Sequence, residues 1–198
     1  MSMERAERLR NGVRNAYSTA ADRPEAKHPF PVGRHFAESL GYPQDMLSDL
    51  PSVSVEAFAG VSDVAVFAEI PVDSRVLDLG CGAGLDSLIV ARGAGPGSRI
   101  IGIDFSDAML VRARQAVIEA GLENLRFFKA DAENLPVKDG SIDIALINGI
   151  FNLNPARDAI FRELSRVVRQ GGAVYAAELI LKEPLPRKIQ ESETNWFA

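Results

Sequence analysis

Residues 76–84 read VLDLGCGAG, a short apolar run that passes directly into a turn with three alternating glycines. The run has the length and the residue types of a buried strand, and the residues after the turn favour a helix. Glycine suits such a turn because the chain bends sharply and its backbone can approach a ligand with no Cβ in the way. The pattern therefore predicts a nucleotide-type binding turn, since a simple tight turn would need only one glycine.

The spacing of the glycines, together with the acid before them, indicates the charge of the ligand. Dinucleotide sites follow G-x-G-x-x-G, whereas this turn follows G-x-G-x-G and has Leu85 where the third dinucleotide glycine would stand. Asp78 lies two residues before Gly80. A carboxylate there would repel a diphosphate and attract a ligand that bears ammonium and sulfonium groups. We therefore expect a cationic ligand.

Two further acids stand where the next strands of a sheet are expected to end. Asp104 follows Gly84 by 20 residues, at a place where a carboxylate can accept hydrogen bonds from both hydroxyls of a ribose. That pairing suits any adenosine cofactor with a free 2′-hydroxyl, so it does not separate NAD from S-adenosylmethionine. Asp131 is suited to accept from an adenine amine. The alternatives are a helix-capping role for Asp104 and a solvated loop position for Asp131.

From Ser74 onward, short β-branched runs alternate with helical patterns, which predicts a parallel sheet with crossover helices. The fold class is therefore α/β: a Rossmann-like, doubly wound, mostly parallel sheet. We expect strands at residues 75–79, 99–104, 125–129, 142–147 and 173–180. We expect helices at 85–92, at 107–120 between Ser106 as N-cap and Gly121 as stop, and at 156–169 with Asn154 as N-cap, Pro155 in the first turn and Gly171-Gly172 beyond the end.

The chain before Pro71 reads as a helical N-terminal extension. Residues 4–20 carry apolar side chains at helical spacing, residues 21–33 are a proline-rich loop, and short helices are expected at 34–40, 44–50 and 63–69, the last with Ser62 as N-cap. The expected organisation is an extension at residues 1–70 that packs on the core as a lid, a nucleotide-binding core at 71–181 and a tail at 182–198.

Composition and charge exclude several other classes of protein. The 198 residues are 46% hydrophobic and 25% charged, as in one globular domain. A net charge of -5 without a long basic run gives no electrostatic support for nucleic-acid binding. No apolar run is long enough to span a bilayer. The single Cys81 cannot form an intrachain disulfide, and the charged N-terminus is unlike a signal peptide, so we expect a cytoplasmic location.

Five pieces of sequence, in order, resemble the class I S-adenosylmethionine-dependent methyltransferases. They cover residues 74–181 and read DLGCGAG at 78–84, GIDFS at 102–106, DA at 131–132, LP at 135–136 and RVVRQGG at 166–172. Further pieces, NGIFNLNP at 148–155, GYP at 41–43 and LP at 50–51, are similar to the arsenite methyltransferases and to their quinone- and sterol-modifying relatives.

The resemblance implies a set of cofactor-binding residues, with S-adenosylmethionine as cofactor and S-adenosylhomocysteine as product. The glycine turn would approach the methionine part with Asp78 near its amino group, and Asp104 would hold the ribose. Phe105 and Met109 would flank the adenine, and Asp131 and Ala132 would read its edge. Asn148 and Gly149 would border the sulfonium. The full set is Asp78, Gly80, Cys81, Gly82, Gly84, Asp104, Phe105, Met109, Asp131, Ala132, Asn148 and Gly149.

Methyl transfer is an in-line displacement that needs alignment and the exclusion of water more than a strong catalytic group. Where the acceptor carries a proton, the candidate bases are His28, His35 and Tyr17, each with a structural role as the alternative. Phe151 and Asn152 are candidates for lining the acceptor site.

The acceptor is expected to be a small or apolar organic molecule. Arsenite enzymes hold As(III) with several cysteine thiolates, whereas this chain has one cysteine, and that one lies in the cofactor turn. No metal site is expected.

Residues 182–198 are too few to supply the two strands that the family adds after the fifth. That strand pair is therefore expected to be absent. An uncovered edge at residues 174–181 would invite pairing with a second copy of the chain, so we expect a homodimer.

Two other functions remain as alternatives to a methyltransferase that acts on a small molecule. One is a non-catalytic protein that binds S-adenosylmethionine or S-adenosylhomocysteine. The other is a nicotinamide-dependent oxidoreductase, against which Leu85 and the lack of a Tyr-x-x-x-Lys pair argue.

Overall fold

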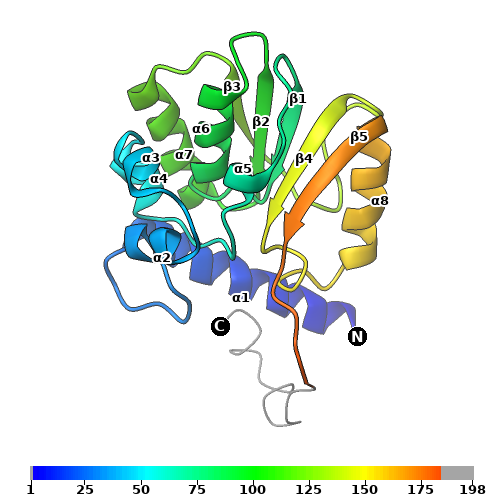
Figure 1. The fold of residues 1–198 in the computed structure, drawn as a ribbon. Coiled ribbons are helices and arrows are strands. Elements are labelled where there is room, and N and C mark those ends of the chain that lie inside the picture. The colour runs from blue at the N-terminus through cyan, green and yellow to red at the C-terminus, as the bar shows by residue number, and fades with distance from the viewer. Residues whose placement is uncertain (1, 184–198) are drawn as a thin grey trace.

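A five-stranded parallel sheet forms the centre of the computed structural model, which describes residues 2–183. The strand order is β3-β2-β1-β4-β5, and each neighbouring pair is parallel (Figure 1). The strands are β1 (Arg75–Leu79), β2 (Arg99–Asp104), β3 (Leu125–Lys129), β4 (Ile142–Asn148) and β5 (Val168–Ala177). The order reverses between β1 and β4, so a crevice is expected at the carboxyl ends of these strands.

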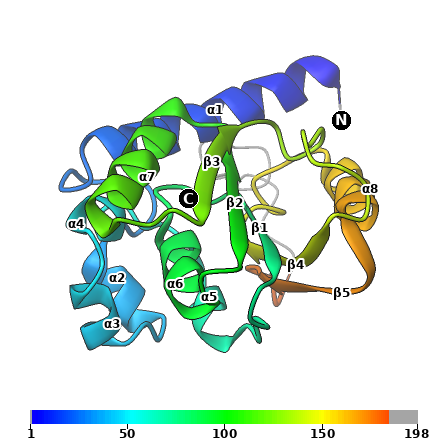
Figure 2. The ribbon, with the colours of Figure 1, turned by 90° about the horizontal axis from the view of Figure 1, so that it is seen from above.

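Helices cover both faces of the sheet. One buried cluster joins strand residues to α5 (Val64–Phe67), α6 (Leu85–Gly93) and α7 (Asp107–Ala120), and a second joins the opposite face to α8 (Arg157–Val167). Figure 2 shows α8 across the sheet from α5 and α6. In β1, Val76 belongs to the first cluster while Leu77 and Leu79 belong to the second, as the twofold alternation of a strand requires. Asp78 therefore faces α6.

The N-terminal extension lies across the carboxyl ends of the strands. It contains α1 (Met3–Asp22), α2 (Arg34–Ser39), α3 (Gln44–Ser48) and α4 (Ser52–Val55) before α5. In Figure 1, α1 runs beneath the sheet on the side to which the arrowheads point. Its buried side chains lie on one stripe, and its Ser18 hydroxyl is 2.9 Å from the Ser106 hydroxyl at the start of α7. The extension thus covers the edge where the crevice lies.

Most of the expected elements are confirmed. The first three strands and α7 have the predicted bounds, with Ser106 as the N-cap of α7 and Gly121 in the left-handed conformation at its end. The N-terminal helix is slightly longer than predicted, and β4 continues by one residue. The short helix α4 was not expected. Ser62 and Asn154 are not the N-caps of α5 and α8, because Asp63 and Ala156 take those positions.

The last strand was predicted too late in the chain, and α8 was predicted too long. The helix ends at Val167 and β5 starts at once at Val168, with a register shift against β4 between Ile142 and Ile144. Gly171, at φ +77°, and Gly172 lie within this irregular strand rather than after a helix. A Cβ on Gly172 would lie 2.7 Å from the Asp143 carbonyl oxygen, so this close approach of strands needs glycine.

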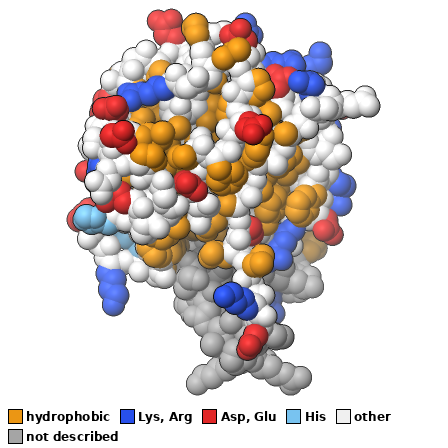
Figure 3. Space-filling view, in the orientation of Figure 1, with side chains coloured by type: hydrophobic (Ala, Val, Ile, Leu, Met, Phe, Trp, Pro, Cys, Tyr) orange, Lys and Arg blue, Asp and Glu red, His pale blue; other side chains and the backbone are white. Residues whose placement is uncertain are grey.

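Apolar side chains are exposed around the outer strand. Val66 and Phe67 of α5, Val174 of β5 and the following Leu179–Leu181 are all exposed. Figure 3 shows hydrophobic side chains gathered on the face that carries α5 and β5. Within residues 2–183, β5 pairs with β4 alone. Of the tail expected at 182–198, and of the strand pair expected to be absent there, all but residues 182 and 183 lie outside the described chain.

No helix in the described part of the chain is long and apolar enough to cross a bilayer.

Candidate functional site

The glycine turn is shaped by three left-handed residues. Gly80, Gly82 and Gly84 have φ of +77°, +52° and +86°, values that side chains other than glycine rarely adopt. A Cβ on Gly80 would overlap Cγ2 of Ile150, and one on Gly84 would lie 2.7 Å from Cζ of Phe127. A Cβ on Gly82 would meet only the Met109 sulfur, at 3.9 Å. Gly80 and Gly84 thus serve packing, and Gly82 leaves open space above the turn.

A cavity lies between this turn and the N-terminal extension. Every predicted cofactor residue except Gly84 lines it. Those residues are Asp78, Gly80, Cys81, Gly82, Asp104, Phe105, Met109, Asp131, Ala132, Asn148 and Gly149. We call the part lined by Asp78, Asp86 and Asn148 the β1 end of the cavity, and the part lined by Phe105, Asp131 and Glu133 the β3 end.

Asp104 connects the glycine turn to the start of α7. Its Oδ2 accepts a hydrogen bond from the Gly82 N–H at 2.9 Å, and its Oδ1 accepts one from the Ser106 N–H at 2.8 Å. Burial raises the pKa of this carboxyl, and the backbone hydrogen bonds from Ser106 and Gly82 oppose that rise. Ser106, and not Asp104, caps α7, because its hydroxyl accepts the Met109 N–H, and Asp104 holds the Ser106 N–H in place.

Two buried carboxyls stand close together at the β1 end. Asp78 accepts a hydrogen bond from the Ser87 hydroxyl at 2.5 Å, and burial, followed by the charge of Asp86, raises its pKa to about 8. Asp86 accepts from the Tyr42 hydroxyl and from Nδ2 of Asn148, the latter at 2.9 Å, and burial raises its pKa as well. Neither Asp86 nor Tyr42 was singled out from the sequence. A cationic group placed here would stabilise the charged form of both acids.

Asn148 fastens the extension to the end of β4. Its Oδ1 accepts from the Val61 N–H at 2.7 Å and the Ser62 N–H at 3.1 Å, while its Nδ2 donates to the Ser62 carbonyl at 2.7 Å and to Asp86. A Cβ on Gly60 would lie 2.6 Å from this nitrogen. Asn148 therefore lines the cavity as predicted, yet its amide is occupied by bonds within the protein.

The β3 end is closed by basic residues of α1. Arg10 forms ion pairs with Asp131 at 3.0 Å and Glu133 at 3.1 Å, and Arg14 lies 3.8 Å from Asp131. The guanidinium carbon of Arg14 is 5.3 Å from the centre of the Phe105 ring, a distance that allows a cation–π contact. The Asp131 side chain is 48% exposed, so this carboxylate is partly solvated, as the alternative of a solvated loop position expected.

Of the three candidate bases, the structure brings only Tyr17 to the cavity. Burial, and then the charges of Asp104 and Glu178, raise the pKa of its phenol above the ordinary value, so it stays neutral and can donate a hydrogen bond. His28 instead contacts the Arg23 carbonyl at 2.8 Å, and His35 is fully exposed beside Glu38. In residues 2–183, no group of three or more His, Cys, Asp or Glu side chains is arranged to hold a metal ion.

The predicted acceptor residues, Phe151 and Asn152, do not line the cavity. Their backbone N–H groups donate to Glu178, at 2.6 and 3.1 Å, and the Phe151 ring stacks on Phe161 at 4.6 Å. Neighbouring residues line the cavity in their place. These are Ile150, Leu153 and Asn154 after β4, and Ala57, Phe58 and Ala59 from the extension. No local motif marks them, because the extension meets the sheet only in the folded chain.

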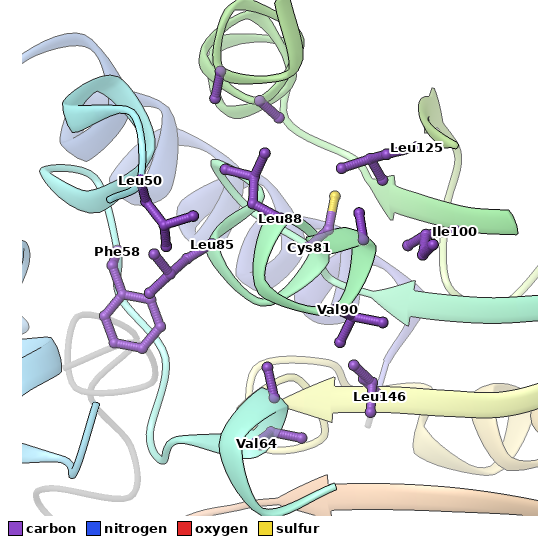
Figure 4. Close-up of a cluster of buried hydrophobic side chains, with 14 of the residues drawn as sticks. Leu50, Phe58, Val64, Cys81, Leu85, Leu88, Val90, Ile100, Leu125 and Leu146 are labelled. Carbon is purple, nitrogen blue, oxygen red and sulfur yellow. The ribbon is translucent and has the colours of Figure 1, made fainter. Parts of the chain in front are cut away.

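The sulfur of Cys81 belongs to the hydrophobic core. In Figure 4 it points into the cluster that contains Leu88 and Leu125. A Cβ on Gly102 would lie 3.0 Å from it, and burial raises the pKa of the thiol well above its usual range. Cys81 is therefore a neutral packing group rather than a thiolate ligand.

Known proteins resemble this chain in sequence and in fold. A family model described as "Methyltransferase domain" matches residues 71–197. The chain is 34% identical over 156 residues to an arsenite methyltransferase of Halobacterium salinarum, a match that covers 78% of this chain and 39% of that protein. It is 33% identical over 103 residues to a demethylmenaquinone methyltransferase of Lactococcus lactis, which covers 52% of this chain and 41% of that one. The chain thus spans about two-fifths of the length of these relatives.

Two solved structures share the fold. An arsenic(III) S-adenosylmethionine methyltransferase from Chlamydomonas reinhardtii superposes with a TM-score of 0.68 at 26% identity, covering 74% of this chain and 52% of that one. A phosphoethanolamine N-methyltransferase from Haemonchus contortus, solved with phosphoethanolamine and S-adenosylhomocysteine, has a TM-score of 0.64 at 17% identity, covering 90% of this chain and 33% of that one.

Proposed function

Because the chain belongs to the methyltransferase domain family, we propose that it transfers a methyl group from S-adenosylmethionine to a small organic acceptor. The observation that carries the proposal is the charge of the cavity lining. Asp78, Asp86 and Asp104 are buried there, and the one basic side chain among the lining residues, Arg10, is already paired with acids. This lining fits a cationic adenosyl ligand and disfavours a diphosphate.

The proposed cofactor supplies a methyl group on a positively charged sulfur. We assign Asp78 to its ammonium group and Asp104 to the ribose hydroxyls, where the remaining lone pairs of a backbone-bonded carboxylate can accept. Phe105 and Met109 would flank the adenine, and Asp131 and Ala132 would bind its edge. Gly80, Gly82, Asn148 and Gly149 line the path between, whereas Gly84 would act by packing against Phe127.

The acceptor side of the cavity supports an apolar organic acceptor. Phe58, Ala59, Ile150 and Leu153 line it, and the neutral Tyr17 phenol is the nearby hydrogen-bond donor. The chain has one cysteine, whose sulfur is in the core, so no set of thiolates is present to hold As(III). The acceptor that we propose therefore differs from arsenite, the acceptor in the name of the Halobacterium relative.

Residues 2–70 would act as the lid of the site. Asn148 holds the 61–62 segment against β4, and Arg10 and Arg14 hold α1 over the β3 end. A closed lid would exclude water and align the acceptor, which is what an in-line displacement requires of the protein.

The test is turnover. The chain is incubated with S-adenosylmethionine and either a reduced naphthoquinone, as an apolar ring acceptor, or arsenite, and S-adenosylhomocysteine is quantified. We expect product with the organic acceptor and none with arsenite. Methylation of arsenite would contradict the acceptor class, and binding of the cofactor without turnover on a panel of apolar acceptors would favour the non-catalytic binding protein.

We also propose a homodimer that forms through the edge of β5 that pairs with no other strand of residues 2–183, and a cytoplasmic location. The exposed Val174 and the apolar side chains at 179–181 support the dimer, and the single buried cysteine suits a reducing compartment. Sedimentation at micromolar concentration tests the assembly: a monomer would contradict it.

A further inference from the structure

The hydroxyl of Ser54 is buried without a partner. Its residue is 0% exposed, and the oxygen makes no hydrogen bond within the described chain. The other buried serines all bond: Ser74 to the Pro71 carbonyl, Ser87 to Asp78, Ser98 to the Ala94 carbonyl and Ser106 to Ser18. A buried hydroxyl without a partner is unfavourable unless a ligand supplies one. Ser54 is among the residues that line the cavity.

The neighbours of Ser54 connect helix α4 to α7 and to the glycine turn. The preceding Val53 carbonyl accepts from Nη1 of Arg112 on α7, at 3.0 Å. The following Val55 belongs to the same buried cluster as Leu85, the first residue of α6, and Ala57 packs with Ala83 of the glycine turn. Helix α4 thus forms the wall of the cavity opposite this turn.

The start of α6 offers hydrogen-bond donors to the same place. Its N-cap is Gly84, which provides no side-chain cap, and both Leu85 and Asp86 line the cavity. The first N–H groups of a helix carry partial positive charge and favour an anionic group. The N-terminus of this nine-residue helix and an unpaired buried hydroxyl therefore line the same cavity.

The charges at the β1 end of the cavity determine which chemical groups of a ligand can bind there. The charged side chains lining this end are Asp78 and Asp86, and the pairing of Arg10 takes place at the β3 end. In an amino acid, the ammonium and the carboxylate are bonded to the same carbon. If the ammonium group of the ligand lies against Asp78, its carboxylate must therefore also lie at the β1 end. Because no basic side chain of residues 2–183 lines this end, neutral donors of the described chain have to bind it.

We propose that the Ser54 hydroxyl, together with the N–H groups of Leu85 and Asp86 at the start of α6, binds the carboxylate of the amino-acid part of the cofactor. The inference rests on the proposed function and names a residue of the extension that acts in it. Helix α4 then distinguishes adenosyl ligands that carry an amino-acid group from those that lack one.

The test compares two ligands on matched variants by calorimetric titration. S-adenosylhomocysteine carries the amino-acid group, and 5′-methylthioadenosine has the same adenosine and thioether without it. In Ser54→Ala we expect at least about a tenfold loss of affinity for S-adenosylhomocysteine, the effect of one hydrogen bond to a charged group. Affinity for 5′-methylthioadenosine should change less than twofold.

Thermal unfolding without ligand gives a second readout. Because Ser54→Ala removes an unpaired buried hydroxyl, we expect its melting temperature to equal or exceed that of the wild type. Ser98→Ala removes a buried serine that bonds to the Ala94 carbonyl at 2.6 Å. It should melt lower and keep the wild-type ratio of the two affinities. Ser52→Ala, an exposed change in the same helix α4, should alter neither.

Equal losses for both ligands in Ser54→Ala, or no loss for either, would overturn the inference while leaving the proposed cofactor intact. Failure of the wild type to bind S-adenosylhomocysteine would overturn the proposed function and this inference with it.

Discussion

The two ends of the cavity hold their acids in different ways. At the β1 end, Asp78 and Asp86 are 2% and 6% exposed and accept hydrogen bonds from side chains of α6, β4 and the extension. At the β3 end, the half-exposed Asp131 forms ion pairs with arginines of α1. Buried carboxyls depend on each hydrogen bond that they receive. Exposed ion pairs contribute little and weaken in salt. The β1 end should therefore be intolerant of change, and the β3 end tolerant of it.

The largest effect is expected at the turn beside the β1 end. Gly80→Ala places a Cβ against Ile150 at a φ of +77°. We expect a loss of about 2–4 kcal/mol in the free energy of unfolding, from backbone strain and overlap, and loss of S-adenosylhomocysteine binding. Urea denaturation and calorimetry measure the two effects.

Gly93→Ala is the matched control for Gly80→Ala. No atom lies within 4 Å of a Cβ at Gly93, the last residue of α6. It should be neutral, or stabilising by up to about 1 kcal/mol. Equal effects of the two substitutions would show that the turn is not the constrained element.

Next in size is the loss of one donor to Asp86. Tyr42→Phe removes the hydroxyl that donates to this buried carboxyl and whose oxygen lies 3.0 Å from the Ser62 carbonyl oxygen. We expect a destabilisation of about 1–3 kcal/mol in urea denaturation. The control is Tyr175→Phe, whose hydroxyl makes no hydrogen bond within residues 2–183, and it should change stability by less than about 0.5 kcal/mol. If the two variants were equally stable, the network at the β1 end would contribute nothing.

A pH dependence should follow from Asp78. Its pKa in the folded protein is about 8, above the value of about 3.9 for an unfolded chain. The folded state therefore binds the extra proton, and the stability that this proton provides is lost as pH rises from about 4 to 8. The free energy of unfolding should fall by about 1 kcal/mol from pH 7 to pH 8 relative to Asp78→Asn. Parallel pH profiles of wild type and variant would contradict the assignment.

The smallest effect is expected at the β3 end. Asp131→Asn removes the ion pairs of this 48% exposed carboxylate to Arg10 and Arg14, and should destabilise the protein by less than about 1 kcal/mol. The difference in the free energy of unfolding between the variant and the wild type should shrink between about 0.1 M and 1 M salt, because the higher ionic strength screens exposed charges almost completely. A loss of more than about 2 kcal/mol in the free energy of unfolding that persists in about 1 M salt would contradict the comparison, because the β3 end would then depend on its charged pairs as strongly as the β1 end depends on its hydrogen bonds.

The parts of the fold that were predictable carry local signals. β1, β2 and β3 are bounded by turn residues, and α7 lies between Ser106 and Gly121, which act at its two ends as expected. The start of β5 was not predictable, because Gly171-Gly172 look like a helix stop and become part of a strand through the irregular pairing of β5 with β4, where Gly172 lies against the Asp143 carbonyl. Local rules cannot anticipate such a tertiary contact.

The candidate site shows the same division. Its glycines and the acids at strand ends follow one chain pattern, and all of them except Gly84 line the cavity. Tyr42 and Asn148 lie 44 and 62 residues from Asp86, so no spacing rule could connect them. For the same reason His28 and His35 could not be placed outside the cavity from the sequence alone.

The most direct test of the account is calorimetric titration of the wild-type chain with S-adenosylhomocysteine and, in parallel, with NAD, beside an Asp104→Ala variant whose folding is checked by thermal melting. The account predicts that the wild type binds S-adenosylhomocysteine and not NAD, and that a folded Asp104→Ala chain loses this binding. Binding of NAD, or of neither ligand, would contradict the claim that the buried acids at the carboxyl edge of the sheet form a site for a cationic adenosyl cofactor.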